Sequence, residues 1–577
     1  MRPIRLGAVA LVMVLLAACS GVPHNSPPLV ISSVGGEVPT TNNEISPHPG
    51  DDPRSIVAGF LKAAVASSPT DARHSGSRQF LTPDAGSKWN DGNVTVLADY
   101  SIQLPQLLGD TAVVKVTGVN QGQLDIHGVY TPSLKSADSG ATSTYTFNLS
   151  KVSGQWRING LAPGVLVGLA DFQNVYSARV LYFFDSTESR LVPDLRYSQL
   201  SGEPLAQWML AQMLTGPRPE LAQSVQNEIP DQVDPRRATI TSTDQITLDL
   251  PGSAQLDGQA RQRLAGQLAY TFGGLLISGV VSLDDAGHPV DIPGYGTKFN
   301  KLNLPDYGPQ GVSAVVQPYY LNDGGLISGV DFKRVPGTVG DGKYSLDSMA
   351  LRRATTGELR IVARTSSNTV VVGPASGPLT TVRLPAGTRS RPDWEPHTSN
   401  AWVAVGSAIY RFGADLRPQA VPLPTGTFSG GQIVSLRFSP DGVRLAIVVQ
   451  GVDGSNTLWI GSVVRSSGSV SLDSVEPISG PTLSVSDVAW ADPIGLLMIA
   501  ARTGEHAKVW AVQSDGSFPL VRDTGELPQP ESIAAAVDQP ILLATSGRAV
   551  WVQRNLVWTS LSGGAQATIG YAPAYAP

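Results

Sequence analysis

In this 577-residue chain, Cys19 is the residue whose chemistry is best predicted from its neighbours in the sequence. Cys19 is the only cysteine, which excludes an intramolecular disulfide and a cysteine-based zinc site. It follows Leu16, Ala17 and Ala18, and small residues at this spacing before a cysteine predict a lipobox. The thiol would take a diacylglycerol, and cleavage before Cys19 would free an amine that can also be acylated, for example by palmitate. Several acyl chains anchor a protein stably where a single chain does not.

The residues before Cys19 must deliver that thiol to the membrane. Arg2 and Arg5 form a positive segment, and an apolar run from Leu6 to Ala18 follows them. The run is too short to span a bilayer as a helix but has the length of a signal-peptide core. We therefore predict a signal peptide at 1–18 and a lipid-anchored protein on the extracytoplasmic face of the cell membrane. An ordinary secretory signal with an incidental cysteine is the alternative.

Catalytic constellations are missing from the rest of the sequence. It contains no Gly-x-Ser-x-Gly elbow, no Walker A loop and no His-Glu-x-x-His motif, and its seven histidines are scattered. Asp284 and Asp285 beside Gly287 fit a solvated hairpin turn better than a calcium loop. We predict no catalytic residue, no metal and no cofactor, although distant carboxylates could still be paired by the fold.

Composition narrows the possible partners and the domain organisation. The chain has 41 basic and 47 acidic residues, so no basic surface for nucleic acid is expected. Its length predicts several domains. Residues 19–50 are rich in Pro, Ser, Gly, Asn and Thr and predict a flexible tether behind the lipid.

The first folded unit is expected at 51–165. Asp52 can cap a helix that has Pro53 at its first position and an apolar face from Ile56 to Val65. Alternation from Tyr145 to Leu149, a turn at Ser153-Gly154 and a return strand through Trp156 and Ile158 predict a hairpin. A helix followed by a meander of strands resembles the α+β fold of the nuclear transport factor 2-like (NTF2-like) superfamily.

The second unit is expected at 175–300, in the order strand, helix, strand, helix, strand. The predicted strands are Val180–Phe184, Ile246–Leu250 and Val280–Leu283. One helix would carry Leu205 to Met213 and end at Gly216-Pro217, and Asp257 would cap the other. The order of elements, with Leu-Thr-Gly-Pro after the first helix, is similar to the GerMN domain of sporulation and germination proteins.

The third unit, 312–577, is expected to be all-β. An apolar strand, a turn and a second strand recur about every 44 to 52 residues, most clearly around Ser439-Pro440-Asp441-Gly442. That spacing matches a four-stranded propeller blade and predicts about five or six blades, with a β-sandwich as the alternative. Five tryptophans recur in phase with the blades and are expected to pack between them: Trp394, Trp402, Trp459, Trp490 and Trp510.

The lipobox, tether, α+β unit, GerMN-like unit and propeller together resemble the actinobacterial LpqB lipoprotein family. That resemblance implies a two-component signalling accessory, with the extracytoplasmic domain of a sensor histidine kinase such as MtrB as its partner. The kinase and its response regulator MtrA are tied to cell-envelope homeostasis and division. Two alternatives stay open, a hydrolase or lyase acting on cell-wall glycan and a lipoprotein that binds glycan or solute.

Overall fold

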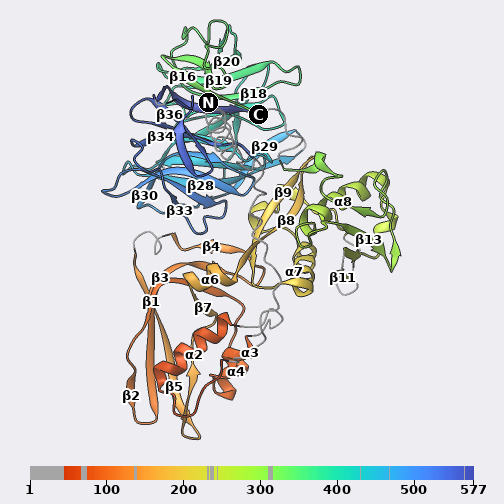
Figure 1. Cartoon of the computed structure of the whole chain (residues 1–577), viewed down its shortest axis with the longest axis vertical. Helices are drawn as coiled ribbons and strands as arrows, with labels where there is room; N and C mark the ends of the chain where they lie inside the picture. The colour runs from red at the N-terminus through yellow and green to blue at the C-terminus, as the bar shows by residue number, and fades with distance from the viewer. Residues whose placement is uncertain are drawn as a thin grey trace, which may run out of the picture. The chain divides into compact units, whose positions relative to one another are not determined.

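The computed structural model describes residues 45–577, apart from 67–73, 135–139, 231–232, 234–238, 243–244, 310–315, 429, 467 and 565. Its elements form three regions: the N-terminal region from α2 to α6, the middle region from β8 to β15, and the propeller region from β16 to β39 (Figure 1). The first two mix helices and strands and the third is all-β, which confirms the predicted fold class. The lipobox residues Leu16 to Cys19 lie outside the described residues.

The N-terminal region packs helix α2 (Pro53–Val65) against a seven-stranded sheet. Asp52 caps the helix as predicted, since its side chain accepts from the Ser55 N–H. The sheet order is β6-β5-β3-β1-β7, with β2 and β4 added on β3 and with β7 parallel to β1. The strands are β1 (Val94–Ile102), β2 (Gln106–Leu108), β3 (Thr111–Leu124), β4 (Tyr130–Pro132), β5 (Thr142–Val152), β6 (Gln155–Gly160) and β7 (Val165–Gly168), and the other helices are α3 (Ser75–Arg78), α4 (Pro83–Lys88) and α6 (Leu169–Val175).

The middle region contains the five predicted elements and several strands that the apolar pattern did not indicate. Helix α7 (Gly202–Thr215) ends at Gly216, and α8 (Gly258–Phe272) begins after its Asp257 cap, both as predicted. The expected direct step from the first strand to α7 is wrong, because a further strand, β9, lies between them. The strands are β8 (Ser177–Asp185), β9 (Leu191–Ser198), β10 (Val225–Gln226), β11 (Thr239–Ser242), β12 (Ile246–Asp249), β13 (Val281–Asp285), β14 (His288–Pro289) and β15 (Lys298–Phe299).

The middle region has two sheets. One has the order β10-β8-β9, and the other has the order β11-β12-β13-β14 with β15 paired to β13. Strands β12 and β13 are parallel, and α8 is the crossover between them. Asp285 and His288 close the β13–β14 hairpin with positive φ angles at Ala286 and Gly287, so the predicted turn is confirmed there.

The propeller region consists of six antiparallel sheets within the described residues. In four sheets the strands pair in the order in which they follow in the chain, and a fifth does the same with a short extra strand paired to its third strand. They are β18 (Leu346–Arg353) to β21 (Thr380–Thr381), β22 (Asp393–Trp394) to β25 (Gln419–Val421), β26 (Gln432–Phe438) to β29 (Ser469–Pro477), β30 (Leu483–Trp490) to β33 (Leu520–Arg522), and β34 (Pro530–Ala534) to β38 (Thr568–Ile569).

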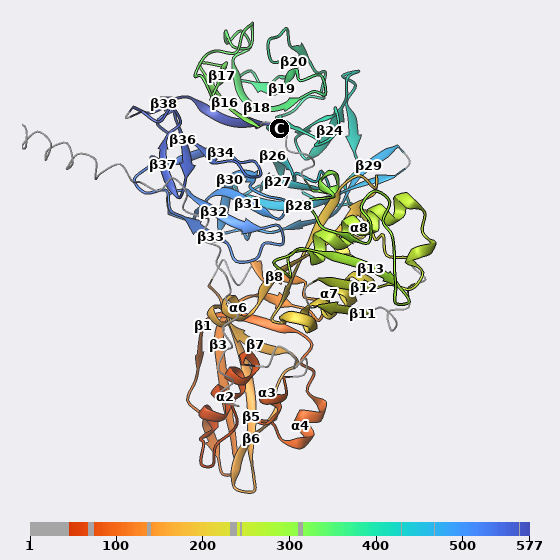
Figure 2. The same ribbon diagram turned by 45° about the vertical axis from the view of Figure 1, so that its right-hand side comes forward.

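The sixth sheet closes the ring by joining the two ends of the region. Its order is β17 (Gly325–Ser328), β16 (Gln317–Asn322) and β39 (Tyr571–Ala576). The last strand contacts both β18 and β34, so the C-terminal end of the chain completes the ring of innermost strands (Figure 2). Because each blade exposes apolar faces that only its neighbours cover, closure removes the last uncovered edge.

The tryptophans pack as predicted. Four of them are buried in the hydrophobic cores of the propeller region: Trp394, Trp402, Trp490 and Trp510. Trp459 is partly buried and packs against the core that contains Trp402. At the Ser439–Gly442 turn, Asp441 Oδ1 accepts from the Val443 N–H and Gly442 has φ 74°, which are the features of a tight strand reversal.

Candidate functional site

Strand β9 carries charged residues into the interior. All eight of its residues are buried, although among the described strands it is the edge of its sheet, beside β8. Val192 belongs to the core of the middle region, whereas Leu195 and Tyr197 belong to the core of the N-terminal region. The two faces of this one strand therefore hold two hydrophobic cores together.

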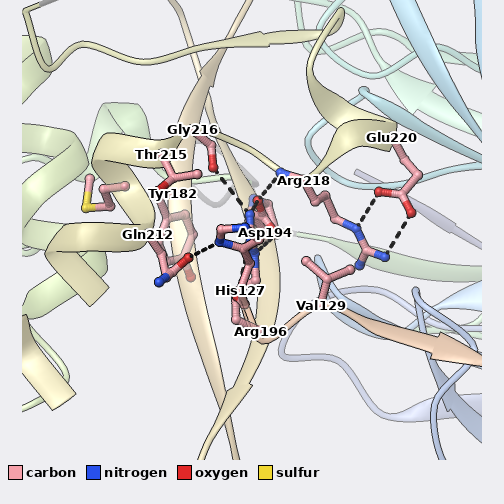
Figure 3. Close-up of polar contacts among 12 residues, drawn as sticks. His127, Val129, Tyr182, Asp194, Arg196, Gln212, Thr215, Gly216, Arg218 and Glu220 are labelled. Atoms are coloured by element: carbon pink, nitrogen blue, oxygen red, sulfur yellow. Dashed lines mark hydrogen bonds and ion pairs between the residues drawn. The ribbon is translucent and has the colours of Figure 1, made fainter. Parts of the chain in front are cut away.

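An ion pair lies along one face of β9 (Figure 3). Arg196 donates from Nε to Oδ1 of Asp194 and from Nη2 to Oδ2, each at 2.8 Å. The Arg218 main-chain N–H also donates to Asp194 Oδ2 at 2.8 Å. Asp194 is fully buried and Arg196 nearly so. Two parallel charge-assisted hydrogen bonds join them, and this bidentate geometry gives the strongest hydrogen bonds between such groups.

The loop at Asp125–Gly128 of the N-terminal region contacts this pair. Arg196 Nη1 donates to the His127 carbonyl at 3.1 Å, and His127 Nδ1 lies 3.0 Å from Gln212 Oε1 on α7. The Tyr197 N–H donates to the Gly128 carbonyl at 2.8 Å. A Cβ at Gly128, whose φ is +73°, would lie 2.6 Å from the Tyr197 carbonyl oxygen, so the close approach requires glycine.

Arg218 extends the charged chain toward the propeller region. Its Nε and Nη2 donate to the Glu220 carboxylate at 2.9 and 3.3 Å. Burial alone would lower the pKa of Arg218, but Glu220, Asp515 and Asp194 outweigh it and raise the pKa. Burial would in turn raise the pKa of Glu220, and Arg218 outweighs that effect and lowers it. Both groups therefore stay charged.

A loop of the propeller region supplies a further carboxylate. Asp515 Oδ1 accepts from the Ser517 N–H at 2.9 Å, and the Ser517 hydroxyl lies 2.6 Å from the Tyr197 hydroxyl. Asp515 Oδ2 is buried without a hydrogen-bond partner among the described residues. Burial raises the pKa of Asp515 against the opposing effects of Arg218 and Ser517. Burial and the Asp515 charge also raise the pKa of Tyr197.

Arg444, which follows the Ser439–Gly442 turn, makes another contact from the propeller region. Arg444, which is buried, donates from Nη1 to Asp441 Oδ2 at 3.3 Å and from Nη2 to the Pro193 carbonyl of β9. Burial lowers the pKa of Arg444, and Asp441 and Asp194 oppose that effect. The Ser439–Gly442 turn thus supplies, in Asp441, the carboxylate that pairs with Arg444 where Arg444 contacts β9.

We call these contacts the β9 junction, which comprises Asp194, Arg196, Tyr197, Arg218, Glu220, Asp441, Arg444, Asp515 and Ser517 with the His127–Gly128 loop. Asp194, Glu220 and Asp441 each pair with a guanidinium, which leaves Asp515 as the unpaired carboxylate of this set. Carboxylates committed in this way are poorly placed to exchange protons with a substrate. The arrangement is instead suited to hold three regions in one geometry.

Sequence reasoning missed this junction. The signal was present in β9, where Asp194 and Arg196 interrupt an otherwise apolar stretch. Charged residues two positions apart on a buried strand must pair, because an isolated buried charge is too costly.

A second candidate site lies in the N-terminal region. It is a pocket of about 580 Å³ beside α2, lined by Ile45, Ala58, Leu61, Lys62, Val65, Ala66, Leu97, Tyr100, Ile102, Val116, Leu166, Val167, Gly168, Asp171 and Val175. Most of these side chains are apolar, and Lys62, Tyr100 and Asp171 are the polar ones. Nothing in the sequence pattern distinguished these positions from an ordinary core.

The fold and the junction define a multidomain scaffold that ends in a β-propeller. Family models match it in three places: the N-terminal domain of lipoprotein LpqB at residues 46–173, the sporulation and spore germination domain at 180–291, and the LpqB beta-propeller domain at 325–576. The chain is 30% identical to Lipoprotein LpqB of Rhodococcus opacus over 77% of each chain. It is 26% identical to that of Nocardia farcinica over 96% of this chain and 95% of the relative. The chain belongs to the Lipoprotein LpqB family.

This membership confirms the resemblance stated from the sequence, and a lipoprotein family implies association with a membrane. The family is defined by lipoprotein and propeller domains and not by an enzymatic activity. In the part of the chain that the structure describes, no helix has both the length and the hydropathy needed to cross a membrane. Among solved structures, a chain of a nidogen/laminin complex aligns with 45% of this chain at 10% identity and a TM-score of 0.34, which is too low to support an inference.

Proposed function

We propose that this chain is a lipid-anchored lipoprotein on the extracytoplasmic face of the cell membrane that binds and modulates a sensor histidine kinase of the MtrB type. The two-component system concerned would control cell-envelope homeostasis and division. The observation that carries the proposal is membership of the Lipoprotein LpqB family along most of the chain.

The anchor in this proposal is Cys19, with diacylglycerol on its sulfur and an acyl group on its amine. Confinement to the membrane raises the effective concentration of a weak contact with a neighbouring membrane protein, much as a linker does. A kinase with two states is then shifted toward the state that this partner binds better. Such modulation needs differential binding and no chemistry by the lipoprotein.

The β9 junction supports a binding role. Hydrogen bonds of Arg196 to the His127 carbonyl, of Tyr197 to Ser517 and of Arg444 to the Pro193 carbonyl join the three regions. A partner that contacts two regions would therefore not have to order them first. Pre-organisation of this kind lowers the entropic cost of association. The same rigidity would let a contact on the propeller region be felt in the N-terminal region.

The decisive experiment is crosslinking in intact membranes. The full chain should recover a sensor histidine kinase, and deletion of the gene should change phosphorylation of the cognate response regulator. Absence of any kinase among the products, together with unchanged regulator phosphorylation, would refute the proposal. Turnover of cell-wall polymer by the purified chain would instead favour an envelope hydrolase.

The anchor is tested separately. Cys19→Ala should release most of the protein from the membrane fraction, because the thiol that takes the lipid is gone. Ser20→Ala, the adjacent change, should leave the distribution as it is. Mass spectrometry of the mature chain checks the same point, and an unmodified thiol there would contradict it.

A further inference from the structure

The pocket of the N-terminal region has the size and lining of a ligand site. Its volume of about 580 Å³ lies within the range of about 300–1,000 Å³ that small-molecule sites occupy. Leu61 and Val65 line it from α2, and Leu97, Val116 and Val167 line it from the sheet. The volume alone does not select the ligand, but the apolar lining favours a long hydrocarbon chain over a polar molecule.

Charge at the pocket is uneven. Lys62 is exposed on α2, and within the described residues it has no carboxylate partner. The other charged lining residue, Asp171 of α6, lies near Tyr100 of β1. Burial and the Asp171 charge raise the pKa of the Tyr100 hydroxyl. Lys62 is therefore the one positive side chain among the lining residues, and it suits an anionic head group.

An exposed apolar hairpin continues the pocket wall. Ile102 and Val116 line the pocket and face each other across β1 and β3. Beyond them the chain turns through Leu104, Leu107 and Leu108, whose exposed fractions are 79%, 63% and 81%. Three exposed leucines beside a pocket mark a surface that meets an apolar phase or partner.

The start of the described chain brings a membrane within reach. Ile45, the first described residue, itself lines the pocket. Only about 26 residues separate it from Cys19, a span on the order of 90 Å when fully extended. If Cys19 carries the anchor, as the proposed function requires, the pocket works close to lipid.

We propose that this pocket binds an anionic single-chain lipid, with the acyl chain between α2 and the sheet, the head group at Lys62, and the Leu104–Leu108 hairpin contacting the bilayer from which the lipid is drawn. The ligand class follows from the apolar lining, the lone lysine and the leucines together. A polar glycan matches none of the three.

The test uses the full chain carrying Cys19→Ala, so that its own acyl groups cannot be the ligand and the result does not depend on a kinase. The probe is cis-parinaric acid, a fluorescent fatty acid, titrated without detergent. Saturable binding is expected. Ala58→Trp and Val175→Trp fill the pocket from two different elements, and each should weaken binding about tenfold or more. Ala211→Trp, an exposed alanine on α7, is the matched control and should bind normally.

Head-group recognition is tested in the same assay. The second ligand is a long-chain alcohol, which has the same hydrocarbon chain without the carboxylate. Lys62→Gln should weaken binding of the fatty acid but not of this alcohol, while Lys88→Gln should change neither. Absence of saturable binding, or undiminished binding by both folded tryptophan variants, overturns the pocket assignment. Equal binding of acid and alcohol by the parent chain overturns the head-group assignment.

The bilayer contact is measured by flotation with phosphatidylglycerol vesicles. The paired change Leu107→Ser and Leu108→Ser should reduce flotation of the Cys19→Ala chain and leave parinaric acid binding intact. Unchanged flotation would show that the hairpin does not contact the bilayer. Because kinase crosslinking is a separate measurement, failure here leaves the proposed function standing.

Discussion

The β9 junction and the pocket beside α2 both lie within the described part of the chain, but the junction consists of charged groups and the pocket is lined mostly by apolar ones. At the junction, buried carboxylates and guanidinium groups satisfy one another at 2.8 to 3.3 Å. At the pocket, apolar side chains surround space that no described side chain fills, and leucines nearby are exposed.

The difference separates residues that hold the fold from residues available to a ligand. Charge buried with its partner has nothing left to offer a ligand, and removing one member is costly. Exposed apolar surface is unfavourable in water, so a ligand that covers it binds with a gain in free energy. Changes at the two places should therefore have contrasting effects.

The largest effect is expected from Asp194→Ala. It leaves the buried Arg196 guanidinium and the Arg218 N–H without their acceptor, which costs about 3–5 kcal/mol. Denaturant and thermal unfolding of the full chain measure the loss. The control is Asp84→Ala, which breaks an exposed pair with Lys88 and should cost about 0.3–0.5 kcal/mol. Equal losses in the two variants would show that the junction is not a structural clamp.

Gly128→Ala should come next. A residue with a side chain at φ +73° costs about 1–3 kcal/mol, and the added methyl group would also press on the Tyr197 carbonyl. Gly154→Ala is the matched control, because that glycine has a φ of +76° and no described atom lies within 4 Å of an added Cβ. Unfolding midpoints of the two variants separate backbone strain from the contact with β9, and identical midpoints would mean that the contact contributes nothing.

Asp515→Asn tests the unpaired carboxylate. The raised pKa of Asp515 means that its protonated form is preferred in the folded state, so its stabilising effect is present below the usual aspartate pKa. That effect is lost as the pH rises through the raised pKa. Asparagine does not ionise, so the variant should be more stable than the parent chain at neutral pH.

The pH dependence of unfolding checks this prediction. The advantage of Asp515→Asn should shrink as the pH falls toward the usual aspartate range, where the parent carboxyl is also neutral. Asp523→Asn, an exposed aspartate nearby in sequence, serves as the control. An advantage that stays constant with pH would show that ionisation of Asp515 is not its cause.

The smallest effect on stability is expected at the pocket end. Leu107 is mostly exposed, so Leu107→Ser should change the free energy of unfolding by no more than about 0.5 kcal/mol. The same substitution at the buried Leu195 of β9 should cost several times more. Thermal unfolding of both variants makes the comparison, and a large loss at Leu107 would mean that the hairpin is part of the core.

Local sequence signals located most of the secondary structure. Asp52-Pro53 and Asp257 marked the starts of α2 and α8, and Gly216 marked the end of α7. Caps and turns depend on residues a few positions apart, which is why they can be read without the fold. The recurrence around Ser439–Gly442 indicated blades for the same reason.

Strand β9 and the pocket could not be found in this way. The alternation rule assumes one polar face and one apolar face, whereas β9 is buried on both faces and carries its own ion pair. The pocket depends on how far α2 lies from the sheet, a distance that no spacing along the chain encodes. The predicted lipobox at Cys19 lies outside the described residues and stays a prediction.

The sequence by itself determined the order of the regions, the blade period and the family, because these depend on local patterns repeated in a fixed order. Only the tertiary structure decided that Arg218, Arg444 and Asp515 meet at one strand, and that α2 leaves a hollow beside its sheet. Contacts between residues hundreds of positions apart depend on how whole elements pack, and packing is a property of the assembled chain.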